Sequence, residues 1–121
     1  MTISEFEYRG FRAVEFEHEL IEYKVLENAI VIHHLFTYGY PADIISTVIV
    51  PYDGKSLAKV TEVRLKSMSN KPSSLRYYEV IIDTPFEELK ERIKEMSSYE
   101  LRRFVNEIYK KEKVKEYVKV Y

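Results

Sequence analysis

The fold is decided around one stretch, Arg76-Tyr77-Tyr78-Glu79-Val80-Ile81-Ile82, and the residues that follow it. Through Asp83 the apolar residues mostly alternate with polar ones, as in a β-strand. After Thr84 they recur every three or four positions, as in an α-helix, at Phe86, Leu89, Ile93 and Met96 and then at Leu101, Phe104, Val105 and Ile108. The sequence therefore predicts an α+β fold, with an antiparallel sheet of four to five strands and two C-terminal helices packed on one side.

Four segments up to this change of period are predicted as strands from their β-branched content and bounding turns. They are residues 29–38, 44–50, 57–67 and 75–83. The first is apolar at nearly every position, which suits a central strand. Asp53 and Gly54 lie between the second and the third, so we expect those two strands to form a hairpin. Residues 67–74 are polar and are predicted to form a loop.

Two segments admit more than one secondary structure. In residues 11–28, apolar residues alternate with glutamates from Val14 to Leu20, which favours a strand, although the glutamate content also suits a helix. The alternation shifts by one position between Leu20 and Ile21, which predicts a bulge or a turn. In residues 113–121, valines alternate with polar residues and tyrosines, which favours a returning strand over a continued helix.

Both predicted helices begin with a capping-box pattern. In the first, Thr84 and Glu87 have the required spacing and Pro85 suits the first helical position. In the second, Ser97 and Glu100 repeat the spacing. The predicted helices cover residues 84–96 and 97–112.

The composition limits the class of protein. A chain of 121 residues with 45% hydrophobic residues suits one domain, residues 1–121, with its own core. Cysteine is absent, which excludes disulfides, thiolate catalysis and cysteine-ligated zinc. No apolar run approaches the roughly 18 residues of a membrane-spanning helix. We expect a soluble protein of the cytoplasm (the host cytoplasm if it is viral) with no membrane partner.

The polar residues carry a second signal. The chain holds 17 Glu but 3 Asp, no Gln, and 3 each of Asn and Met. Many glutamates and lysines with few thermolabile side chains are typical of hyperthermophilic proteins. The load of Ile, Val and Tyr is similar to that of small proteins from hot-acid archaea or their viruses. The composition therefore favours a thermophilic archaeal or archaeal-virus source.

The charge is unevenly distributed although the net charge is -1. Residues 102–119 hold seven Lys or Arg, most of them on the second predicted helix or just after it. Basic side chains can contact phosphates, and a strand tyrosine beside an arginine can stack on a base. The predicted nucleic-acid-binding residues are Arg102, Arg103, Lys110, Lys111, Lys113, Arg76 and Tyr77.

The amino-terminal part is acidic, with seven Glu in residues 1–30. A strand face lined with carboxylates can imitate phosphates or meet a basic protein surface. The predicted partner-binding residues are Glu15, Glu17, Glu19 and Glu22.

His33 and His34 are adjacent in the predicted central strand. Neighbours on a strand point to opposite faces, so the two imidazoles cannot chelate one ion together. We expect one of them to be packed and hydrogen-bonded and the other to lie at the surface. In the alternative, one histidine works with a carboxylate and a divalent metal in catalysis.

No catalytic constellation, glycine-rich phosphate loop, metal motif or cofactor motif can be identified in the sequence. The sequence therefore predicts a small non-enzymatic binding or regulatory protein whose partner is nucleic acid or another protein. Two alternatives remain: an inhibitor that acts through its acidic amino-terminal strand, and a small metal-dependent nuclease or hydrolase that uses His33 or His34. A homodimer through the helix at 84–96 is a further possibility, because its apolar stripe has heptad-like spacing.

Overall fold

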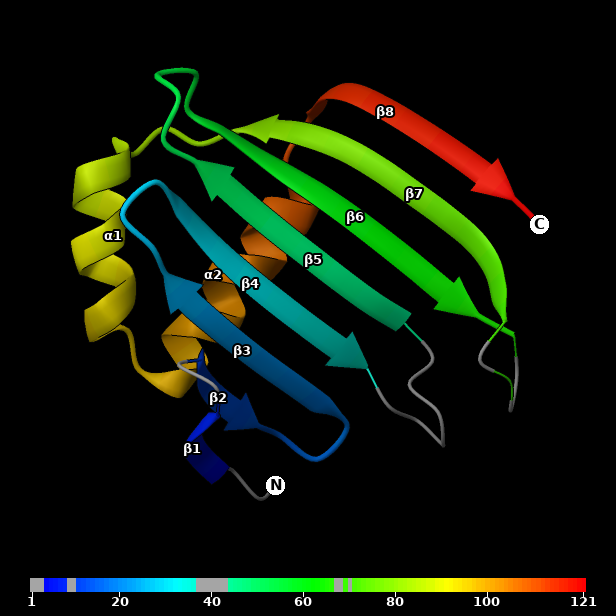
Figure 1. Ribbon diagram of the computed structural model, residues 1–121, viewed down its shortest axis with the longest axis horizontal. Coiled ribbons are helices and arrows are strands. Elements are labelled where there is room, and N and C mark those ends of the chain that lie inside the picture. The colour runs from blue at the N-terminus through cyan, green and yellow to red at the C-terminus, as the bar shows by residue number, and fades with distance from the viewer. Residues whose placement is uncertain (1–3, 9–10, 37–43, 67–68, 70) are drawn as a thin grey trace.

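The computed structural model describes residues 4–8, 11–36, 44–66, 69 and 71–121. These residues form eight strands and two helices (Figure 1). In chain order the elements are β1 (Ser4–Tyr8), β2 (Phe11–Glu15), β3 (Glu19–Val25), β4 (Ala29–Phe36), β5 (Ile44–Pro51), β6 (Leu57–Leu65), β7 (Pro72–Ile81), α1 (Phe86–Glu95), α2 (Ser98–Lys110) and β8 (Lys113–Val120).

All eight strands belong to one antiparallel sheet, in which the spatial order is the order of the sequence. The prediction of an α+β fold with an antiparallel sheet and two helices late in the chain is confirmed. The predicted number of four to five strands was too small. Both helices connect β7 to β8 and pack into one core on the same face of the sheet; in the view of Figure 1, α2 passes behind the strands and α1 lies to the left of their ends.

The ambiguous segment at residues 11–28 forms a hairpin of two strands, β2 and β3. The Phe16 N–H donates a hydrogen bond to the Glu19 carbonyl (2.7 Å), which closes the turn over Glu17 and His18. The turn accounts for the shift in the alternation of apolar residues, because the chain reverses there. The helical alternative for this segment was wrong, and so was a single strand running through residues 14–20.

The other uncertain segments also add to the sheet. Residues 113–121 were correctly favoured as a strand, since β8 pairs with β7 over its length. Strand β7 begins at Pro72, so the carboxyl-terminal part of the predicted loop at 67–74 is strand instead. Residues 67, 68 and 70 of that loop lie outside the described residues.

The two helices begin differently. At α2 the predicted capping box is present: the Glu100 N–H donates to Ser97 Oγ (3.2 Å) and the Ser97 N–H donates to Glu100 Oε1 (3.4 Å). At α1 the N-cap residue is Pro85, and no side chain accepts a hydrogen bond there. Thr84 instead accepts a hydrogen bond from Arg92 (3.3 Å), so the prediction of a cap at Thr84 was wrong.

The core lies between the helices and the face of the sheet that they cover. On α1 the buried residues are Leu89 and Ile93, with Met96 directly after the helix, and on α2 they are Leu101, Val105 and Ile108. They pack against strand residues that include Ile21, Ile32, Val48, Val60 and Tyr78. The apolar stripe of the first helix therefore packs on the sheet and is not available for a helix-mediated homodimer.

Candidate functional site

The face of the sheet without helices carries a row of aliphatic side chains. Five half-buried residues lie directly opposite one another on consecutive strands from β3 to β7: Leu20, Leu35, Ile45, Val63 and Leu75. Ile21, next in sequence to the first of them, lies in the helix-covered core. Since successive strand residues point to opposite faces, the row belongs to the uncovered face. We call this side of the sheet the open face and these five residues the aliphatic row.

A polar row runs beside the aliphatic row on the open face. Its members are Glu22, His33, Thr47, Thr61 and Tyr77, again opposite one another on consecutive strands. His33 Nδ1 lies 2.9 Å from a carboxylate oxygen of Glu22, and the Tyr77 hydroxyl donates to Glu79. An apolar centre beside hydrogen-bonding groups is the usual anatomy of a protein–protein interface.

The two central strands are apolar on both faces. In β4, Ile30 and Ile32 lie in the core, while Val31 and Leu35 are half-buried on the open face. Strand β5 repeats this arrangement, with Val48 in the core and Ile49 38% exposed on the other side. Strands of this kind are typical of sheets that are covered on both sides. Among the described residues, helices cover only one side, so the open face has the composition of a surface that meets another molecule.

Beneath the helices lies a buried polar network centred on His34, whose side chain is completely buried. Its Nε2 lies 2.9 Å from Glu19 Oε2, and its Nδ1 lies 2.9 Å from the Tyr109 hydroxyl. The same hydroxyl lies 2.9 Å from Ser46 Oγ, and Arg102 donates a hydrogen bond to the other oxygen of Glu19 (2.6 Å). The network thus ties α2 to three strands, β3, β4 and β5.

Burial lowers the pKa of His34 below its ordinary value, although the hydrogen bond to Glu19 acts in the opposite direction. Burial also raises the pKa of the Tyr109 hydroxyl. Among the described residues, every buried side-chain nitrogen or oxygen has a hydrogen-bond partner. The network is therefore satisfied internally, as structural polar groups in a core are.

The two histidines occupy the opposite environments that their adjacency predicts. His34 has both ring nitrogens occupied and no exposed surface, so a substrate cannot reach it without opening the core. His33 lies on the open face, 34% exposed, with Glu22 as its partner. In the part of the chain that the structure describes, no three His, Asp or Glu side chains are grouped to hold a metal ion.

Several of the predicted nucleic-acid-binding residues are engaged within the molecule. Arg102 pairs with Glu19 and lies over the Phe16 ring, with its guanidinium carbon 4.9 Å from the ring centre. Lys113 donates to the carbonyls of Tyr109 and Lys111, so it caps the end of α2. Contacts within the molecule therefore explain why one cation, Arg102, lies near the start of α2 and another, Lys113, lies just after its end.

The remaining predicted basic residues do not form one patch. Arg76 pairs with Glu116 (2.7 Å) on the helix-covered side, whereas Tyr77 points to the open face. Lys111 lies 3.7 Å from Asp83. Arg103 and Lys110 are exposed on α2 and have no ion pair within the described ranges. The structure does not bring these seven residues together on one surface.

The predicted acidic surface is also divided. Glu19 is part of the His34 network and only slightly exposed, and Glu22 lies on the open face beside His33. Glu17 is in the β2–β3 turn, 3.7 Å from His18, and Glu15 is exposed at the end of β2. The alternation that suggested one acidic strand face is interrupted by the turn, so the four carboxylates point in different directions.

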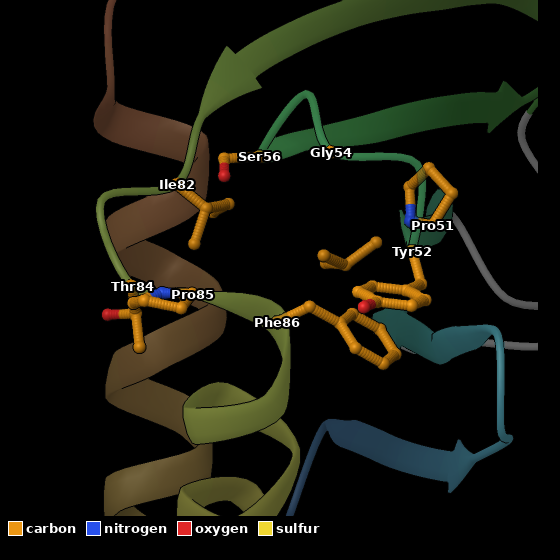
Figure 2. Close-up of a pocket in the computed structure, with 9 residues that line it drawn as sticks. Pro51, Tyr52, Gly54, Ser56, Ile82, Thr84, Pro85 and Phe86 are labelled. Atoms are coloured by element: carbon orange, nitrogen blue, oxygen red, sulfur yellow. The ribbon is translucent and has the colours of Figure 1, made fainter.

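A small pocket lies where the β5–β6 turn meets the start of α1 (Figure 2). It has a volume of about 200 Å³, and the rings of Tyr52 and Phe86 stack beside it with centres 5.0 Å apart. Figure 2 shows Pro51, Ile82 and Pro85 around the same hollow. The lining holds no charged or catalytic side chain, and the volume is below the usual range for small-molecule sites.

Comparison with known proteins finds no matching family model, no matching curated protein and no matching solved structure. Neither described helix has the length and apolar character needed to cross a membrane. We therefore infer the function of the protein from the geometry of the molecule.

Sequence reasoning missed the aliphatic row as a candidate surface. The signal was present, because the segments 29–38 and 44–50 are apolar at both parities. For residues 29–38 this signal predicts a central position in the sheet, which the structure confirms. The same signal also implies that the side of the sheet without helices is apolar. This second implication becomes visible only when the strand register is known.

Proposed function

We propose that this protein is a non-enzymatic binding module that docks a protein partner on its open face. The single observation that carries the proposal is the aliphatic row, which extends across five strands on the side of the sheet opposite the helices. Contiguous apolar surface on a folded domain marks interaction sites. The aliphatic row, with the polar row beside it, has the apolar centre and polar border of a protein–protein interface.

The geometry gives less support to a nucleic-acid partner. The open face offers Tyr77 for stacking, but its hydroxyl is bonded to Glu79 and the neighbouring Arg76 points to the other side. Most of the basic residues that the sequence indicated have internal partners. A groove that tracks a phosphate backbone needs a continuous positive lining, which the described surface does not provide.

The geometry gives little support to a hydrolase or nuclease either. His34 is sealed in the core, and among the described residues His33 has only Glu22 as a carboxylate partner. The thermophilic archaeal or viral source and a regulatory role remain part of the proposal, and both rest on composition alone.

The test compares the wild-type chain with two variants in pull-downs from its native cell extract. Ile45→Lys places a charge in the middle of the aliphatic row. Tyr99→Lys is the matched control, because Tyr99 is 56% exposed on α2, away from the open face. The identified partner is then purified and titrated with all three proteins. We expect Ile45→Lys to weaken binding at least about tenfold, as for a residue at an interface centre, and Tyr99→Lys to have little effect.

An anisotropy titration with single- and double-stranded oligonucleotides tests the nucleic-acid alternative. The proposal predicts no binding at about 150 mM salt. Tight, salt-sensitive binding that is lost in the double variant Arg103→Glu, Lys110→Glu would contradict the proposal. Equal partner affinity of the wild type and Ile45→Lys would also contradict it.

A further inference from the structure

Strand β8 forms one edge of the sheet and is exposed on both of its faces. Among the described residues, half of the large apolar side chains with high exposure come from this strand and the residue after it. They are Val114 (54%), Tyr117 (57%), Val118 (53%), Val120 (77%) and Tyr121 (54%). In Figure 1, β8 lies beyond the helices over much of its length. An edge strand with this much exposed apolar surface is a site for pairing with another strand.

The backbone of β8 also has unpaired groups. The Tyr121 N–H donates to the Ser73 carbonyl of the β7 end (3.0 Å), so Tyr121 points its backbone groups toward β7. In an antiparallel ladder these directions alternate along the strand. Glu116, Val118 and Val120 therefore point their N–H and C=O groups away from the sheet. The β-bulge of this pair lies at Glu79, near the other end of β8, and leaves the alternation from 116 to 120 intact.

We propose that a second copy of this chain pairs with this edge, β8 against β8, about a two-fold axis that passes midway between the two copies of Val118. Both copies then contribute three outward-pointing residues. Each of these residues donates one backbone hydrogen bond and accepts one, which makes about six bonds across the interface. Such an interface is isologous, as in most symmetric dimers.

The side chains select this register. With Val118 opposite itself, the facing pairs are Lys115 with Tyr121, Glu116 with Val120 and Tyr117 with Lys119, each of them formed twice. Every lysine in the paired stretch faces a tyrosine ring, to which an ammonium group is attracted. Within one chain, Lys119 already lies over the Tyr121 ring at 4.8 Å.

Other symmetric registers of similar length bring like charges together. Centring on Tyr117 places Lys115 opposite Lys119 of the second copy. Centring on Glu116 or on Lys119 places that residue opposite its own copy. Lysines on an edge strand usually prevent pairing, but here they exclude the wrong registers and permit the one centred on Val118.

The geometry of the dimer has a consequence for binding. The two-fold axis of this antiparallel pair is perpendicular to the plane of the sheet, so both open faces lie on the same side of the dimer. The two eight-stranded sheets become one sheet of sixteen strands, with the two aliphatic rows end to end across it. A partner with two docking sites would then bind both copies with increased avidity.

The experiment measures the mass of the full chain in solution by sedimentation equilibrium over a concentration series. We expect the mass to double from 14.5 kDa as the concentration rises. Val118→Lys places two ammonium groups on the two-fold axis and should weaken the dimer at least about tenfold. Val114→Lys is the matched control, since Val114 has the same exposure but lies outside the paired stretch. A monomer at every concentration, or a dimer that Val118→Lys does not weaken, would overturn the proposal.

Cross-linking tests the register directly, because the chain has no cysteine of its own. Val118→Cys places two thiols on opposite sides of the axis, at Cα separations of about 5.5 Å that a disulfide can span. Mild oxidation should convert most of this variant to a covalent dimer. Val114→Cys should remain largely monomeric under the same conditions, and equal cross-linking of the two variants would contradict the register.

Discussion

The two faces of the sheet are formed by the same strands, but their side chains differ in burial and in contacts. On the helix-covered face, residues such as Ile32 are completely buried, and the one buried histidine has partners at both nitrogens. On the open face, Leu35 and Ile45 are apolar but only half-buried. The sequence therefore encodes two apolar layers, and the described helices cover only one of them.

The largest expected difference between the faces concerns packing. Ile32→Ala should lower the free energy of unfolding by about 2 to 5 kcal/mol, because it leaves a cavity in the core. Ile49→Ala removes the same atoms from a residue that is 38% exposed on the open face, and should cost less than about 1.5 kcal/mol. Chemical denaturation of both variants makes the comparison. Equal losses would show that both faces are packed alike.

A smaller difference is expected for hydrogen bonds. Tyr109→Phe removes the partner of His34 Nδ1 and of Ser46 Oγ, while His34 Nε2 keeps Glu19, and should cost about 1 to 3 kcal/mol. The matched change on the open face is Tyr77→Phe, where water can replace the lost hydroxyl at Glu79, and its cost should be below about 1 kcal/mol. Thermal unfolding of the two variants measures the difference. A Tyr77→Phe variant as unstable as Tyr109→Phe would place Tyr77 in a buried environment.

The third expectation concerns pH. The pKa of folded His34 is below the ordinary value of 6.5, so the unfolded chain binds a proton first as the pH falls. The His34 contribution to the free energy of unfolding therefore decreases below about pH 6.5, by at most about 1.4 kcal/mol per pH unit. Unfolding measured between pH 7 and about pH 5 should show a smaller slope in His34→Gln than in the wild type. Identical slopes would mean that folding leaves the pKa of His34 unchanged, which would contradict this expectation.

Much of the fold could be predicted from the sequence, because the change from period 2 to period 3.6 near Asp83 is strong. The number of strands could not. The turn at Glu17 and His18 contains no Gly, Pro, Asn or Asp, so nothing in its chemistry separates β2 from β3. The cap at Ser97 was predictable from spacing, whereas at Thr84 the same spacing failed because the side chain binds Arg92 instead.

The candidate site was harder to predict than the fold. Adjacency on a strand was enough to place His33 and His34 on opposite faces. Charge counts were misleading for Arg102 and Glu19, which neutralise each other across 83 positions of sequence. Only the tertiary structure shows that these two charged residues pair with each other next to the core. The aliphatic row depends in the same way on the register of five strands, which no local pattern specifies.

The most direct test of the central claim is site-specific photo-cross-linking of the intact protein in its native extract. One variant carries a photoreactive side chain at Ile49, on the open face, and the other carries it at Tyr99, on α2. If the open face is the docking surface, we expect a discrete cross-linked protein product from position 49 and none from position 99. A product from position 99 alone would contradict the claim that the open face is the docking surface.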